Sequence, residues 1–164
     1  MYLEEDGVAK KLITSLIIGF ALTSSVQAKT IEKWHAGEVD GFTRYWTTNN
    51  IGASFVVWCH PQRPVNGTLL HVVIDGKTPT PNTRMKLIID NEIMEIPVNE
   101  QGYIDTGCAT CADTFEYVWH RLRAATAIAV KFKDDSYAGF SLKGAKEILP
   151  ANVCPTDWKK KQAS

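Results

Sequence analysis

Hydrophobic residues of this chain fall in short runs of β-branched and aromatic side chains, separated by polar segments with proline, glycine or asparagine. This pattern is typical of strands joined by turns. We expect strands at residues 42–46, 53–58, 68–74, 85–89, 93–98, 127–132 and 137–142. Asp90-Asn91 and Asp134-Asp135-Ser136 each separate two runs by only a few residues, which predicts two hairpins. Residues 60–67 and 75–82 contain prolines and are expected to be loops.

A different period marks one helix, because four apolar residues recur at i, i+3, i+4 and i+7. These residues are Phe115, Val118, Trp119 and Leu122. Asp113 precedes them and Glu116 follows it by three residues, which predicts a capping box at the start of the helix. Residues 143–149 are expected to form one or two helical turns before Pro150 ends them.

The order of these elements selects the fold class. Strand follows strand through short polar loops, whereas a doubly wound parallel sheet needs a helix between successive strands. We therefore predict a mainly β fold, an antiparallel β-sandwich with one packed α-helix.

The N-terminus has the features of a signal peptide. Lys10-Lys11 precede an apolar run at residues 12–26, and Val26-Gln27-Ala28 has the small-x-small form that a signal peptidase accepts. A run of about 15 residues is shorter than the roughly 18 to 20 needed to span a bilayer, and position 29 is not a cysteine, so no stable membrane anchor is expected. We predict a signal peptide at residues 1–28 and a single β-rich domain at residues 29–164, periplasmic or secreted.

An acidic stretch complicates the start of this segment. Glu4-Glu5-Asp6 lies ahead of the basic residues, where negative charge opposes insertion with the positive end inside. We hypothesise that translation starts at Val8 rather than at Met1, which the mass of the unprocessed precursor would test.

Composition excludes one class of partner. The 164 residues include 18 basic and 18 acidic side chains, so a nucleic-acid partner has no electrostatic support. Hydrophobic residues make up 45% and charged residues 22%, as expected of one globular domain rather than a disordered chain.

All four cysteines follow the predicted cleavage site, and an even number in an exported chain predicts two disulfides. Four cysteines allow three connectivities; a bond between Cys59 and Cys154 would leave Cys108 to pair with Cys111. In the chain-entropy model a loop of nearly 100 residues contributes about 4 to 5 kcal/mol, and a four-residue loop much less.

Cys108-Ala109-Thr110-Cys111 supplies the sharpest enzymatic hypothesis. It lies just before the predicted helix, whose positive end could lower a thiol pKa, as in thiol oxidoreductases. No βαβ unit precedes it, so we favour a structural disulfide. Zinc is disfavoured because export promotes oxidation and no histidine lies at a ligand spacing beside the two cysteines.

The remaining candidate residues point away from catalysis. His35, His60, His71 and His120 are dispersed, and no serine lies in a G-x-S-x-G motif. We therefore predict no catalytic, cofactor or metal site. The loop at 75–82, with Lys77, could contact a partner or could be a connector. The aromatic residues Trp34, Tyr45 and Trp46 could form a binding patch, although core positions are favoured.

Several motifs together resemble the invasion-associated locus B family of exported bacterial proteins. They are the Phe-Val-Val-Trp-Cys run at 55–59, the C-x-x-C ending in Cys111-Ala112, the helix, the run at 129–132 and the Gly-Phe-Ser-Leu-Lys-Gly-Ala run at 139–145. The resemblance covers about two-thirds of the mature chain, although here no second cysteine follows soon after Cys59. It implies a disulfide-containing β-sandwich that acts by binding and is linked to host-cell invasion, and it transfers no catalytic residue.

Three functions remain open. The leading one is a non-catalytic exported binding protein with a protein partner, the second a periplasmic inhibitor or immunity protein, and the third a thiol oxidoreductase that uses Cys108 and Cys111. Only the third requires a reducible disulfide that solvent can reach.

Overall fold

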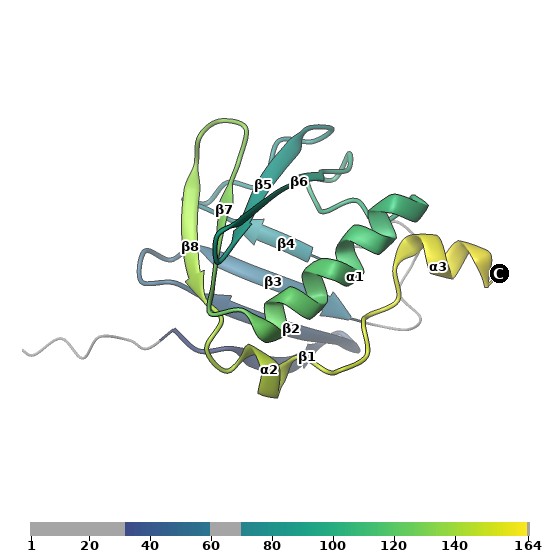
Figure 1. The fold of residues 1–164 in the computed structure, drawn as a ribbon, viewed down its shortest axis with the longest axis horizontal. Helices are drawn as coiled ribbons and strands as arrows, with labels where there is room; N and C mark the ends of the chain where they lie inside the picture. The colour runs from purple at the N-terminus through teal and green to yellow at the C-terminus, as the bar shows by residue number, and fades with distance from the viewer. Residues whose placement is uncertain (1–31, 60–69, 164) are drawn as a thin grey trace, which may run out of the picture.

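Figure 1 shows the computed structural model of the protein, which describes residues 32–59 and 70–163. The predicted signal peptide, the proposed start at Val8 and the loop predicted at 60–67 lie outside these residues. Two four-stranded antiparallel sheets form the framework of the described chain.

The first sheet has the strand order β1-β2-β3-β4, in which every neighbour along the sheet is also a neighbour in sequence. Its strands are β1 (His35–Val39), β2 (Phe42–Thr48), β3 (Ser54–Cys59) and β4 (Leu70–Val73). Strand β1 was not predicted from the sequence. Phe55 and Val57 of β3 lie opposite Val72 and Leu70 of β4, and all four side chains are buried.

The second sheet has the order β6-β5-β7-β8. Its strands are β5 (Arg84–Ile89), β6 (Glu92–Pro97), β7 (Ala127–Lys131) and β8 (Tyr137–Ser141). Both predicted hairpins are confirmed, with turns at Asp90-Asn91 and between β7 and β8. Leu87 lies opposite Val130 in the sheet, and both are fully buried.

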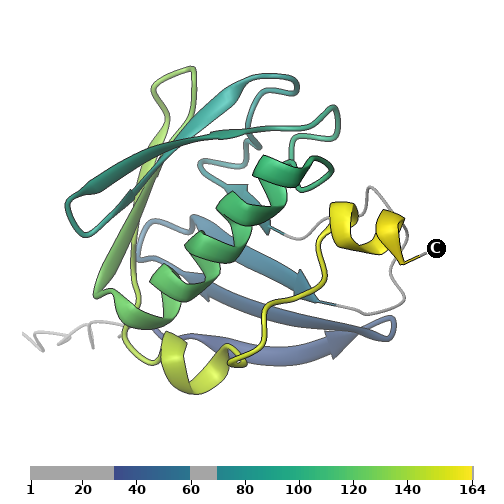
Figure 2. The same cartoon turned by 45° about the vertical axis from the view of Figure 1, so that its right-hand side comes forward.

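The two sheets share one core, as the sequence predicted for a sandwich. Phe55 of the first sheet meets Phe140 of the second edge-on, with ring centroids 5.8 Å apart. Helix α1 (Ala109–Ala124) runs across the opening between the sheets (Figure 2). Its predicted stripe is buried, and Trp119 packs edge-on against Tyr45 of β2 at 6.3 Å.

The predicted capping box was wrong. Helix α1 begins at Ala109, and its N-cap is Cys108, whose sulfur accepts from the backbone N–H of Cys111 at 3.1 Å. Asp113 therefore lies inside the helix, and the Glu116 carboxylate accepts instead from the Lys159 ammonium at 2.7 Å. The apolar stripe starts one turn earlier than predicted, at the buried Ala112, so the chain is helical before the first large apolar side chain.

Side chains just before β1 and just after β2 close the edge of β8. The Trp34 indole N–H donates to the carbonyl of Ser141 at 3.0 Å, and the Ser141 N–H donates to Glu32 at 2.7 Å. The Asn49 amide donates to the carbonyl of Gly139 at 3.1 Å. The two sheets are thus joined through the backbone polar groups of an edge strand.

Two disulfides staple the domain. Cys59 at the end of β3 bonds to Cys154, and Cys108 bonds to Cys111, which is one of the three connectivities left open by the sequence. Helix α2 (Ala145–Ile148) falls within the predicted segment, whereas α3 (Asp157–Gln162) was not predicted. The backbone N–H of Trp158 in α3 donates to the carbonyl of Thr106 at 3.0 Å, which holds the C-terminal segment near the start of α1.

Candidate functional site

The side of the first sheet that faces away from the core forms the candidate site, and we call it the outer face. Cross-strand register places each of its residues opposite another member, because directly paired residues share a face. The outer face consists of His35, Gly37, Val39, Phe42, Arg44, Trp46, Thr48, Ser54, Val56, Trp58, His71 and Val73.

The composition of the outer face is unusual for the solvent side of a sandwich. Exposed positions of antiparallel sheets are ordinarily polar. Here the described strand positions include no aspartate, glutamate or lysine, and Arg44 is their one permanently charged residue. Aromatic residues and arginine are enriched, and lysine and acidic residues depleted, at the centres of protein–protein interfaces. The outer face has that composition.

An arginine contacts two indoles at the centre of this face. The Arg44 guanidinium carbon is 4.1 Å from the ring centroid of Trp46 and 5.5 Å from that of Trp58. We call these three residues the Arg44 clamp. The imidazole of His35 stacks on Trp46 with ring centroids 5.3 Å apart, so the contacts extend onto β1.

A glycine makes room for the clamp. Gly37 of β1 lies opposite Arg44, and a Cβ added at Gly37 would lie 3.3 Å from two carbons of the Trp46 ring. A Cβ at this position would require the indole to shift by a few tenths of an ångström. The position of Trp46 over β1 therefore depends on a residue without a side chain.

The outer face continues toward β4 through a histidine. The rings of His71 and Tyr103 meet edge-on with centroids 5.0 Å apart. Burial lowers the pKa of His71, because the charged imidazolium loses hydration there. The neutral imidazole is thus favoured, which keeps this part of the face uncharged.

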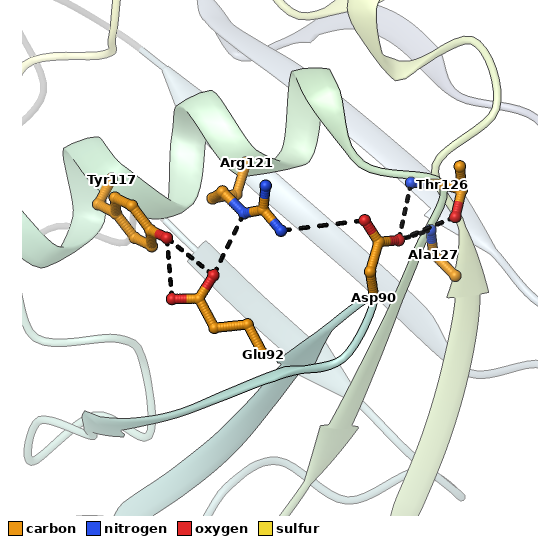
Figure 3. Close-up of polar contacts among 6 residues, drawn as sticks. All are labelled: Asp90, Glu92, Tyr117, Arg121, Thr126 and Ala127. Atoms are coloured by element: carbon orange, nitrogen blue, oxygen red, sulfur yellow. Dashed lines mark hydrogen bonds and ion pairs between the residues drawn. The ribbon is translucent and has the colours of Figure 1, made fainter.

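A polar cluster joins the β5–β6 turn to helix α1 (Figure 3). The Tyr117 hydroxyl lies 2.8 Å from both oxygens of the Glu92 carboxylate, and the Nε of Arg121 lies 3.4 Å from the same group. Arg121 also approaches Asp90 at 3.9 Å. Asp90 accepts from the backbone N–H and hydroxyl of Thr126, and these bonds hold the pKa of Asp90 below its usual range.

The charged members of this cluster pair with one another. The hydrogen bond to Glu92 raises the pKa of the Tyr117 phenol, so the phenol stays protonated at neutral pH. The carboxylates of Asp90 and Glu92 both pair with Arg121. This arrangement indicates a structural role, the attachment of α1 to the second sheet.

The structure brings the cysteines together in pairs but does not gather the histidines. Cys108 is exposed and Cys111 half-buried, at the start of α1. His35 and His71 lie on opposite edge strands, His120 is in α1, and His60 lies outside the described residues. Within residues 32–59 and 70–163, no group of three or more His, Cys, Asp or Glu side chains could hold a metal ion.

The aromatic residues of the N-terminal region divide between the two faces. Trp34 is buried in the core, and Tyr45 packs against it, as favoured from the sequence. Trp46 was expected in the core and lies instead on the outer face, because adjacent residues of a strand point in opposite directions. Lys77 of the 75–82 loop pairs with Asp134 in the β7–β8 turn at 3.6 Å; its contact with a partner stays a prediction.

Comparison with known proteins gives one family. A family model described as YfjT matches residues 32–149. No curated protein and no solved structure matches the chain significantly. Among the described helices, none is long and apolar enough to cross a membrane.

Proposed function

The chain belongs to the YfjT family, whose matched region contains both sheets and α1, and we propose that this region is a non-catalytic protein-binding domain acting outside the cytoplasm. The outer face is its binding surface. The observation that carries this proposal is the composition of that face, which combines two tryptophans and one arginine with an absence of lysine and acidic residues at its described positions.

Two features support the extracytoplasmic location. Two disulfides are typical of proteins that mature in an oxidising compartment. The predicted signal peptide leads to the same compartment, periplasmic or secreted. N-terminal sequencing of the exported protein should begin at Lys29; a protein that retains residues 1–28 would contradict export by cleavage.

The resemblance to the invasion-associated locus B family supports a role at the host interface. It rests on the motifs around Cys59, around Cys111 and at residues 139–145. A host-cell invasion assay with a deletion strain would test this part of the proposal, independently of the binding surface.

Site-specific cross-linking tests the binding surface. A photoreactive p-benzoylphenylalanine replaces Val56 at the centre of the outer face, and Ile93, which is exposed on the second sheet, serves as the matched control position. We expect one protein adduct from position 56 and none from position 93, and we expect Trp46→Ala to abolish the adduct. Equal adducts from both positions, or none from position 56, would overturn the proposal.

An inhibitor or immunity protein is a narrower version of the same proposal. A rigid sandwich stapled by two disulfides is a suitable scaffold for blocking an enzyme. Identifying the cross-linked partner tests this version. If the partner is an enzyme, adding this protein in purified form should lower its activity, and a partner without enzymatic activity would exclude the inhibitor role.

A thiol oxidoreductase is a second candidate function, favoured by the exposure of Cys108 at the N-cap of α1. A substrate thiolate would attack the Cys108 sulfur, and Cys111 would leave as a thiolate. A second substrate thiolate would then resolve the mixed disulfide, so the substrate dithiol is oxidised and the Cys108–Cys111 bond is reduced by two electrons. A structural bond should have a reduction potential below about −300 mV, and a catalytic oxidant one near −120 to −180 mV. We expect the former, and insulin-reduction activity lost in a Cys108→Ala/Cys111→Ala variant would instead support the enzyme.

A further inference from the structure

We propose that the Arg44 clamp is a receptor for a single carboxylate, supplied by an aspartate or glutamate of the protein partner. This inference rests on the proposed binding function of the outer face and adds the chemistry of the contact at its centre. Three features support it: Arg44 has no acceptor among the described residues, its guanidinium contacts two indoles, and its neighbours on the outer face are largely apolar.

The guanidinium of Arg44 has no acceptor within the described part of the protein. Its contacts are the two indoles, and its Nε is buried without a hydrogen bond. The other arginines of this part all reach an oxygen. Arg84 donates to the carbonyl of Glu95 at 2.8 Å, Arg123 donates to the carbonyl of Leu149 at 3.1 Å, and Arg121 approaches Glu92 at 3.4 Å. Arg44 alone among them contacts no oxygen acceptor of residues 32–59 and 70–163.

The clamp fixes the guanidinium in advance of binding. The guanidinium lies over the Trp46 ring and farther from the Trp58 ring, and these two contacts limit its orientation, while Gly37 leaves the space that the Trp46 ring occupies. A planar guanidinium presents paired N–H groups that match the two oxygens of a carboxylate. Because its orientation is already restricted, less conformational entropy is lost when a ligand binds.

The surroundings select an acidic side chain of a protein over an acidic saccharide. Phe42 and Val56 neighbour the clamp in the register of the sheet, and Val39 and Val73 lie beyond them. Thr48 and Ser54 carry the hydroxyl groups of the outer face. A saccharide needs hydrogen-bond partners for its many hydroxyl groups. An apolar protein surface with one central carboxylate matches these side chains, and the low local dielectric beside two indoles strengthens the ion pair.

The test uses the mature domain, residues 29–164, and a phage-displayed library of random 12-residue peptides as the probe. We expect selected peptides to carry Asp or Glu beside apolar residues. Replacing that acid by its amide should weaken binding at least tenfold, and Arg44→Gln should weaken binding of the unchanged peptide by a similar factor. The two changes together should produce little further loss, because each removes the same interaction.

Three controls keep the outcomes distinct. Arg84→Gln removes an arginine from the second sheet and should leave binding unchanged. Arg44→Lys keeps the charge but loses the paired N–H groups, and should restore only part of the affinity. The circular dichroism spectrum of each variant must match that of the native protein. If Arg44→Gln does not fold, Arg44→Lys takes its place in the comparison.

Each result decides one question. Peptides that bind Arg44→Gln as well as the native protein but are lost on Val56→Asp would overturn the carboxylate receptor and leave the binding face intact. Peptides insensitive to both changes would overturn the proposed function as well. A library without acid-dependent binders, or Arg44-dependent binding of uronic-acid oligosaccharides in its place, would overturn the choice of an acidic protein segment.

Discussion

One oxygen of the Asp90 carboxylate accepts from both the backbone N–H and the hydroxyl of Thr126, at 3.0 and 2.8 Å. Asp90 lies in the β5–β6 turn with a left-handed φ of 51°, and Thr126 lies just before β7. The pair therefore links a hairpin turn to the neighbouring strand beside the end of α1 (Figure 3). Its charge makes the link sensitive to pH.

Asp90→Asn should lower the thermal stability at pH 7. Asparagine accepts the same left-handed backbone, so the substitution mainly removes the charge. Because the folded pKa of Asp90 lies below its unfolded value, the stabilisation is present above about pH 4 and is lost as the pH falls through the folded pKa. The difference in melting temperature between native and variant should shrink in acid. Asp40→Asn removes a carboxylate from another left-handed turn and is the control for the backbone position.

Burial of His71 should make the stability depend on pH in a second way, through a group that is positively charged when protonated. The pKa of His71 is lowered in the folded state, so between that value and about 6.5 the unfolded chain binds more protons. The free energy of unfolding should therefore fall as the pH falls through this window. NMR titration of the histidine C–H signals should give a midpoint below 6.5 for His71, and His71→Gln should flatten the stability profile. A midpoint above 6.5 would contradict burial of the ring.

Loss of the Cys59–Cys154 bond should lower the free energy of unfolding by about 2 to 5 kcal/mol. The bond closes a loop with a sequence separation of 95 and ties β3 to the segment that carries α3. Urea denaturation of a Cys59→Ser/Cys154→Ser variant measures the change. Removing both Cys108 and Cys111, whose separation is 3, should cost much less. Equal losses for the two pairs would exclude loop length as the source of the difference.

Trp34→Phe should destabilise the protein by about 1 to 3 kcal/mol, since it leaves the carbonyl of Ser141 without its indole donor. The aromatic contact with Phe55 can persist in the variant. Hydrogen exchange should show faster opening of the β8 edge. Trp158→Phe in α3 replaces an indole away from the sheets and should leave β8 protection unchanged.

The sequence predicted the elements whose hydrophobic residues repeat at the spacing of a helix or a strand. The stripe from Phe115 to Leu122 and the β5–β6 hairpin depend on local spacing, and both formed as expected. Strand β1 was not predicted because it is an exposed edge strand whose sequence lacks alternating hydrophobic residues. The Asp40-Gly41 dipeptide was the available sequence signal, because Asp-Gly is typical of a two-residue hairpin turn. In the structure both residues have the positive φ that such a turn requires.

The outer face was only partly predictable. Adjacent strand residues point to opposite faces, so Tyr45 and Trp46 could not both enter the core. The sequence could therefore have assigned one of them to the outside. The pairing of Arg44 with Trp58 depends on the register between β2 and β3, which is set by the turn at Asn49 and by burial of Phe55 and Val57. Local composition does not determine that register.

The closure of the β8 edge also dictates an order of assembly. The hydrogen bond of Trp34 cannot form until Ser141, 107 residues later in the chain, has been synthesised. In the same way, the disulfide of Cys59 requires Cys154. A chain that emerges from its N-terminus therefore keeps β1 to β4 without their opposing sheet until nearly all residues have appeared. Such distant pairings slow folding, because the entropy of closing the loops is lost before contacts compensate for it. During that interval Cys59 can meet Cys108 and Cys111 before its native partner, so we expect a bond from Cys59 to one of them to be the first non-native disulfide.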